Sequence, residues 1–101
     1  MKDVMIGLGS NIGAKSDYLN QALVKINGLD QVAVKQVSQV YQTEPVGYKD
    51  QDDFYNMVAA LEIEEGKAPL KLLEDLLAIE ADLDRKRTIK KGPRTIALDV
   101  F

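Results

Sequence analysis

Cysteine and histidine are both missing from this sequence of 101 residues. Without cysteine, disulfides, thiolate metal sites and cysteine nucleophiles are excluded. Without histidine, the commonest general base and the commonest zinc ligand are excluded as well. Apolar runs are short, and none reaches the roughly 18 residues of a membrane span. The first residues, Met1 to Met5, lack the pattern of a signal peptide. We therefore expect a cytoplasmic protein whose chemistry rests on carboxylates, amides and basic side chains.

The composition is that of a small globular domain, with 46% hydrophobic and 29% charged residues. The net charge of -3 conceals an asymmetry along the chain. Residues 1–84 hold 7 Lys/Arg and 15 Asp/Glu, a balance of -8, whereas residues 85–101 hold 6 Lys/Arg and one acid, a balance of +5. A basic cluster on an acidic chain indicates either a local anion site or a solvated loop.

Hydrophobic periodicity predicts four strands and two helices in the order β-α-β-β-α-β. The strands are expected at Val4–Leu8, Val32–Tyr41, Phe54–Glu64 and Thr95–Phe101. The first helix is expected at Ser16–Asn27, with Ser16 as N-cap and Gly28 as the stop, and the second from Pro69, with an apolar stripe that runs to Leu83. This order is typical of an α+β, ferredoxin-like fold: one domain, residues 1–101, with a four-stranded antiparallel sheet and two helices on one face.

The last strand carries a candidate metal ligand. Because side chains alternate along a strand, Ile96, Leu98 and Val100 should face the helices, while Ala97 and Asp99 share the other face. Two acids at such positions could hold magnesium and a polyphosphate. Ala97 leaves Asp99 as a single carboxylate, which is either a metal ligand or a solvent-facing residue.

Other polar residues also permit two interpretations. The basic residues that follow residue 84 could grip phosphate oxygens. Glu80 borders the apolar stripe of the second helix, where it either pairs with Arg85 or Arg87 or accepts a ligand hydroxyl. Phe54 and Asn56 could stack on a heterocycle and hydrogen-bond its edge. They could equally be ordinary residues at the start of a strand.

Six ordered motifs, taken together, resemble those of the bacterial 6-hydroxymethyl-7,8-dihydropterin pyrophosphokinases of folate synthesis. They are GSNIG at 9–13, SQVYQTEPVG at 38–47, DQDDFYN at 50–56, LL through IE at 72–80, RKR at 85–87 and GPRTIALD at 92–99.

The resemblance implies transfer of diphosphate from ATP to the hydroxymethyl group of a reduced pterin, with Mg²⁺ as cofactor and no nucleic-acid or membrane partner. It implies that the substrate-binding residues are Thr43, Pro45, Val46, Phe54 and Asn56. It implies that the nucleotide-binding residues are Glu80, Arg85, Arg87, Lys90 and Arg94. Arg85, Arg94 and Asp99 would be catalytic, and Asp99 would bind the metal.

The sequence also departs from the family pattern. Ala97 stands where the family has its first metal-binding Asp, Lys91 where it has an aromatic residue, and Asp84 where it has a Gly. We expect the chain to lack the family's C-terminal segment and to leave a sheet edge that a homodimer could cover. Impaired activity is therefore expected. The alternative is a catalytically inactive pterin- or nucleotide-binding relative with a regulatory or assembly role. An RNA-binding role is disfavoured, because the strands lack paired aromatic residues for base stacking.

Overall fold

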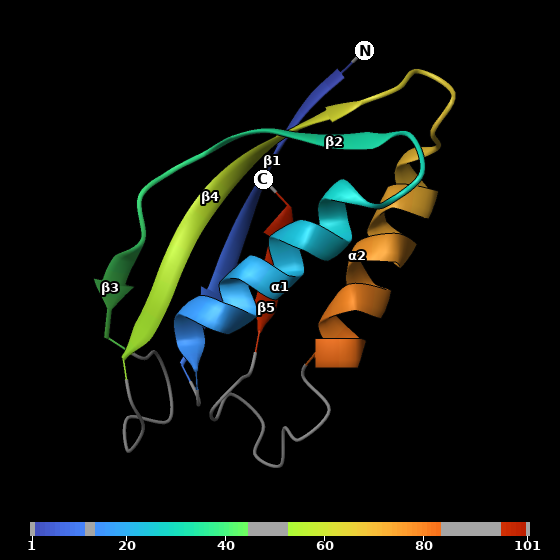
Figure 1. Cartoon of the computed structure of the whole chain (residues 1–101). Helices are drawn as coiled ribbons and strands as arrows, with labels where there is room; N and C mark the ends of the chain where they lie inside the picture. Colours follow the sequence, from blue (N-terminus) through green and yellow to red (C-terminus); the bar gives the residue numbers. More distant parts are fainter. Residues whose placement is uncertain (1, 12–13, 45–52, 84–95, 101) are drawn as a thin grey trace.

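The computed structural model of the chain describes residues 2–11, 14–44, 53–83 and 96–100. Within these residues the elements are β1 Lys2–Ser10, α1 Lys15–Asn27, β2 Val32–Val37, β3 Tyr41–Thr43, β4 Phe54–Ile63, α2 Pro69–Leu83 and β5 Ala97–Val100. The strands form one antiparallel sheet in the order β2-β4-β1-β5, and β3 also pairs with β4. Both helices lie on the same side of the sheet (Figure 1). The α+β, ferredoxin-like expectation is confirmed, although the sheet has five described strands where four were predicted.

The first helix begins one residue earlier than predicted. Its first turn is closed by the N–H of Tyr18, which donates to the carbonyl of Ala14 at 3.0 Å. Ala14 therefore takes the N-cap position, no side chain caps the helix, and the prediction of Ser16 as N-cap is wrong. The stop at Gly28 is confirmed, because its N–H donates to the last carbonyls of the helix. In the described residues, neither α1 nor α2 is long and apolar enough to cross a membrane.

The predicted strand Val32–Tyr41 is divided into β2 and β3, and both pair with the ten-residue strand β4. Between them, the N–H of Ser38 donates to the carbonyl of Val58 at 2.8 Å. The N–H of Val58 in turn donates to the Ser38 hydroxyl oxygen, also at 2.8 Å. A side-chain oxygen thus replaces a backbone carbonyl at this point of the ladder. β2 ends at Val37, yet the N–H of Val58 in β4 still has a hydrogen-bond acceptor.

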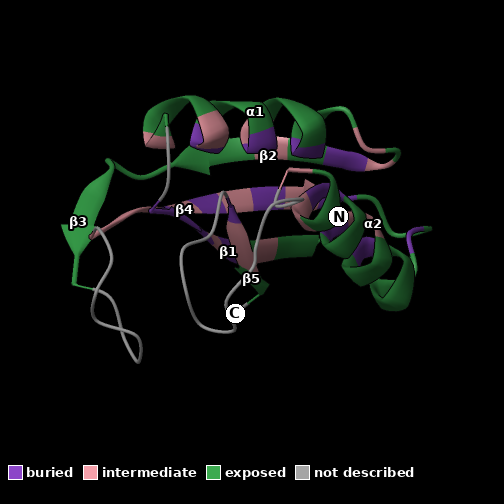
Figure 2. Cartoon of the chain, turned by 90° about the horizontal axis from the view of Figure 1, so that it is seen from below, coloured by how far each residue is buried: buried purple, intermediate pink, exposed green. Residues whose placement is uncertain are grey.

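The hydrophobic core lies between the helices and one face of the sheet, where Figure 2 shows the buried residues gathered. From Asn56 to Ile63 of β4, half-buried and buried residues alternate, as expected for a strand with one covered face. The core combines residues of both layers: Ile6, Leu8, Ala59, Leu61 and Ile96 from the sheet side, and Leu19, Ala22, Ile26, Leu72, Leu76 and Ile79 from the helices. The other face of the sheet is left without a helix in the described residues.

A buried lysine ties α2 to the turn between α1 and β2. The side chain of Lys67 is 2% exposed, and its Nζ donates to the carbonyl of Asp30 at 2.9 Å and to Asp75 Oδ2 at 2.6 Å. Lys71 also pairs with Asp75, at 2.9 Å. The hydrogen bonds from Lys67 and Lys71 hold the pKa of the Asp75 carboxyl below its ordinary value. This cluster therefore fixes the start of α2 with a charge that is compensated.

Candidate functional site

The face of the sheet opposite the helices gathers residues from four strands. Residues directly opposite in an antiparallel pair share a face. The register places Ala97 of β5, Gly9 of β1, Asn56 of β4 and Tyr41 of β3 in one row. The next row contains Asp99, and Asp99 pairs with Gly7. Thr43, Phe54 and Asn56, the predicted substrate-binding residues that the structure describes, therefore share one surface with Asp99. We call this surface the open face.

Two glycines make the floor of the open face shallow. Gly7 and Gly9 are two residues apart in β1 and so lie on the same face. A Cβ atom added to Gly9 would lie 3.0 Å from Asn56 Oδ1 and 3.3 Å from a ring carbon of Phe54. The amide and the aromatic ring therefore lie against the backbone of β1. A strand glycine at such a position indicates a close approach of neighbouring groups.

The amide of Asn56 has a defined orientation. Its Nδ2 donates to Thr43 Oγ1 at 2.7 Å. Thr43 pairs with Phe54 across β3 and β4, so all three predicted substrate-binding residues that the structure describes are neighbours. With Nδ2 engaged by Thr43, Oδ1 is the amide atom available to accept an N–H from a bound heterocycle.

Asp99 lies on the open face two strands away from Asn56 and one row along. Standard strand spacings place the two Cα atoms about 12 Å apart. Asp99 is exposed, whereas Ala97 beside it is half-buried. In the described residues no three Asp or Glu side chains come together in a way that could hold a metal ion. Around Gly7 and Gly9, the open face thus offers the carboxylate of Asp99 and the amide of Asn56, with glycine backbone between them.

Glu80 accepts a hydrogen bond from the backbone of β5, which the sequence did not predict. Its Oε2 accepts the N–H of Leu98 at 2.8 Å, which connects α2 to β5. Leu98 pairs with the buried Leu8, so its side chain faces the helices, as predicted. The carboxylate therefore anchors the strand that carries Asp99. The predicted role of Glu80 in nucleotide binding stays a prediction.

Several predicted site residues lie outside the described residues. They are Pro45, Val46, Arg85, Arg87, Lys90 and Arg94. Conversely, the sequence analysis gave Gly9 no role beyond its place in the GSNIG motif. The sequence pattern that could have indicated its position is the spacing of two residues between Gly7 and Gly9 in an apolar run. In a strand, this spacing puts both glycines on the same face, which then lacks side chains at these positions.

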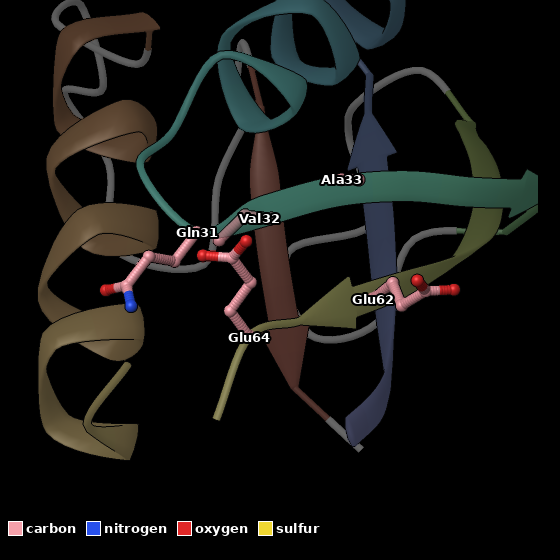
Figure 3. Close-up of a pocket in the computed structure, with 5 residues that line it drawn as sticks. All are labelled: Gln31, Val32, Ala33, Glu62 and Glu64. Atoms are coloured by element: carbon pink, nitrogen blue, oxygen red, sulfur yellow. The ribbon is translucent and has the colours of Figure 1, made fainter. Parts of the chain in front are cut away.

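Two of the hollows among the described residues adjoin β4. One, of about 290 Å³, lies on the open face and is lined by Met5, Gln36, Val37, Ser38, Val58 and Ala60. The other, of about 170 Å³, is lined by Gln31, Val32, Ala33, Glu62 and Glu64. Figure 3 shows that the two glutamates in it point in different directions. This second hollow lies at the opposite end of β4 from Asn56 and carries no site.

Comparison with known proteins identifies the family to which the chain is similar. The family model for 7,8-dihydro-6-hydroxymethylpterin-pyrophosphokinase (HPPK) matches residues 5–101. A 2-amino-4-hydroxy-6-hydroxymethyldihydropteridine pyrophosphokinase of Bacillus subtilis is 46% identical over 96 residues, which cover 95% of this chain and 56% of that protein. The protein of the same name from Haemophilus influenzae is 39% identical over 96 residues, which cover 95% of this chain and 59% of that protein.

A third relative is longer. The folic acid synthesis protein fol1 of Schizosaccharomyces pombe is 40% identical over 99 residues, which cover 98% of this chain and 13% of that protein. The chain thus spans a little over half the length of the two bacterial relatives and a small part of the fungal one.

Proposed function

The chain belongs to the 7,8-dihydro-6-hydroxymethylpterin-pyrophosphokinase family, and on this basis we propose that it binds a reduced hydroxymethyl pterin and ATP for diphosphate transfer. The transfer would move the diphosphate of ATP to the hydroxymethyl oxygen of the pterin and release AMP. The observation that carries the proposal is the meeting of Thr43, Phe54 and Asn56 with Asp99 on one face of the sheet. A cytoplasmic location follows from the proposed substrates.

The proposed pterin site uses the amide of Asn56 and the ring of Phe54. Asn56 Oδ1 accepts an N–H of the heterocycle, while the hydrogen bond from Nδ2 to Thr43 keeps the amide from rotating. The Phe54 ring supplies an apolar surface against which the bicyclic ring packs. The family motif implies that Pro45 and Val46 also bind the pterin. The lack of a side chain at Gly9 lets the Asn56 amide and the Phe54 ring lie close to the backbone of β1.

The proposed nucleotide side uses basic residues and one carboxylate. Arg85, Arg87, Lys90 and Arg94 bind phosphate oxygens, the arginines in bidentate fashion, and Arg85 and Arg94 are catalytic. Glu80 contributes indirectly, since it fixes β5 through Leu98.

Asp99 is the proposed ligand for Mg²⁺. Mg²⁺ commonly takes one or two protein carboxylates together with substrate phosphates. A single carboxylate therefore fits a Mg²⁺ that is carried mainly by ATP, and the ion would neutralise phosphate charge. The protein's own residues hold the two substrates in position, which is the larger part of catalysis in phosphoryl transfer.

A second candidate function is favoured by Ala97. Ala97 lies on the open face in the row of Gly9 and offers no oxygen to a cation. A chain with this residue would bind pterin or nucleotide and turn over slowly or not at all, which suits a regulatory or assembly role.

A homodimer formed through β5 would have to displace Glu80 from the Leu98 N–H. The molecular mass of the chain in solution tests this.

Calorimetry with the hydroxymethyl pterin and with Mg-ATP tests the proposed function directly. We expect the pterin to bind and Asn56→Ala to weaken that binding by about tenfold or more, since the ring N–H loses its acceptor. Asn20→Ala, on the exposed side of α1, is the matched control. Absence of pterin binding to the unmodified chain would refute the proposal. Release of AMP separates the two candidates: a normal enzymatic rate would refute the inactive relative.

A further inference from the structure

Lys15, the first residue of α1, reaches the point where β4 begins. Its Nζ donates to the backbone carbonyl of Asp53 at 3.1 Å, a contact between residues 38 positions apart. The same Nζ lies 4.8 Å from the centre of the Tyr55 ring, within range of a cation–π interaction. Lys15 is half-buried, so solvent screens these interactions less than it would at a fully exposed position.

Asp53 is held from a second direction. Its Oδ2 accepts a hydrogen bond from Gln42 Nε2 at 2.9 Å. Gln42 belongs to β3 and pairs with Tyr55. The residue before β4 is therefore connected to α1 through its carbonyl and to β3 through its carboxylate. These two contacts fix the start of β4 relative to α1 and to β3.

The orientation of β4 at this point decides where the candidate substrate-binding residues point. Adjacent side chains of a strand lie on opposite faces. Tyr55 is therefore on the helix side, where Lys15 contacts it, and Asn56 is on the open face, where its amide lies over Gly9. A contact that fixes Tyr55 and the carbonyl of Asp53 from behind limits rotation of the strand about its own axis.

We propose that Lys15 is a positioning residue for the candidate pterin pocket, which it stabilises by holding the Asp53 carbonyl and the Tyr55 ring so that Phe54 and Asn56 face the ligand. The inference rests on the proposed function for the identity of the ligand. It adds a residue of α1 that touches no ligand and acts through the geometry of β4. The chemical class that the pocket takes is a planar heterocycle with ring N–H groups.

The test compares three substitutions in the full chain. Lys15→Met keeps the aliphatic stem and removes the charge and the donor, and Lys15→Arg keeps both. Lys25→Met is the matched control, since Lys25 is on the same helix and pairs with Asp82 of α2 at 3.3 Å. The readouts are the calorimetric affinities for the hydroxymethyl pterin and for Mg-ATP, and the nitrogen-15 resonance of the Asn56 side-chain amide.

Lys15→Met should weaken pterin binding by about fivefold to tenfold, as expected for one hydrogen bond lost, and leave the affinity for Mg-ATP unchanged. It should also shift the Asn56 amide resonance. Lys15→Arg should restore both readouts, and Lys25→Met should change neither. An unchanged Asn56 resonance in Lys15→Met overturns the inference. So does an equal loss of pterin and Mg-ATP binding that Lys25→Met reproduces, because this would show a general loss of stability.

The failure of the proposed function gives a different result. If the unmodified chain binds no pterin, the proposed function is wrong, and the Asn56 resonance alone decides on Lys15. A shift in Lys15→Met that Lys15→Arg reverses supports the positioning role even then. No shift refutes it.

Discussion

Gly9→Ala is the substitution that tests the geometry of the open face most directly. The new methyl group would lie 3.0 Å from Asn56 Oδ1 and 3.3 Å from a ring carbon of Phe54. Ordinary contacts of a Cβ atom begin at 3.4 Å, so the amide must retreat by about 0.4 Å. The backbone at Gly9 has no left-handed conformation, and the substitution therefore acts through this contact alone.

The expected cost to folding is small. If the hydrogen bond from Asn56 to Thr43, now 2.7 Å, lengthened by about 0.4 Å, it would remain within the ordinary range. Both neighbours of the new methyl group are only half-buried and can move. We expect the free energy of unfolding to fall by about 1 kcal/mol, at the low end for overpacking. This corresponds to a Tm lower by about 4–8 °C.

The expected loss of binding free energy is larger than the expected loss of folding free energy. A displaced Asn56 Oδ1 meets the ring N–H of the pterin at the wrong distance, and the methyl group occupies part of the floor. We expect the affinity for the hydroxymethyl pterin to fall by about tenfold, or about 1.4 kcal/mol.

Calorimetry and thermal unfolding of Gly9→Ala and of Gly28→Ala measure both quantities. Gly28 receives the same methyl group with only ordinary contacts, the nearest at 3.5 Å, and lies at the far end of α1. Gly28→Ala should therefore bind the pterin as the unmodified chain does. If Gly9→Ala also binds it with undiminished affinity, the position of Asn56 over Gly9 does not control pterin binding, and the reasoning fails.

Three further predictions concern β5 and α2. Ala97→Asp should strengthen binding of Mg-ATP by about tenfold, because it adds a second carboxylate on β5; unchanged calorimetric affinity would argue against a metal site on this strand. Glu80→Ala should lower the free energy of unfolding in urea by about 1.5–3 kcal/mol, because the N–H of Leu98 loses a charged acceptor, whereas Glu80→Gln, which keeps an acceptor oxygen, should cost less. The pKa of Asp75 is held below its ordinary 3.8, chiefly by the hydrogen bond from Lys67, so its contribution to stability is complete above about pH 4 and is lost as the pH falls through the folded-state pKa. Asp75→Asn should flatten this acid limb of the urea midpoint, and an unchanged limb would show that other groups control it.

The order of elements and the faces of the strands could be predicted from the sequence because they depend on local periodicity. The alternation of Ile96 and Leu98 with Ala97 and Asp99 is an example, since it follows from the two-residue period of a strand. The α+β architecture followed from the same patterns. The start of α1 at Lys15 could not be derived, because the chain uses no side-chain cap there.

Partners across the fold were harder to predict. Arg85 and Arg87, the partners expected as one alternative for Glu80, lie outside the described residues, and the hydrogen bond from the Leu98 N–H to Glu80 Oε2 was not expected. That contact depends on where β5 lies relative to α2, which no local pattern contains. The break at Ser38 is similar, because a hydroxyl that replaces a backbone carbonyl looks like any serine of a strand in the sequence. The prediction that Asn56 and Thr43 bind the substrate came from motif resemblance, and the hydrogen bond between them could not be derived from it.

The strand region that pairs with β4 is divided into β2 and β3. These two segments should differ in the free energy that local opening requires. Val32 of β2 belongs to the buried core and pairs with the buried Ile63 at the end of β4. β3 has three residues, all exposed, and is held by its pairing and by the contacts of Gln42 and Thr43. Amide hydrogens of β3 should therefore exchange through local opening that leaves β2 closed. A bound ligand that contacts Asn56 would slow exchange in β3 first, so this edge of the sheet can loosen and tighten while the core keeps its full stability.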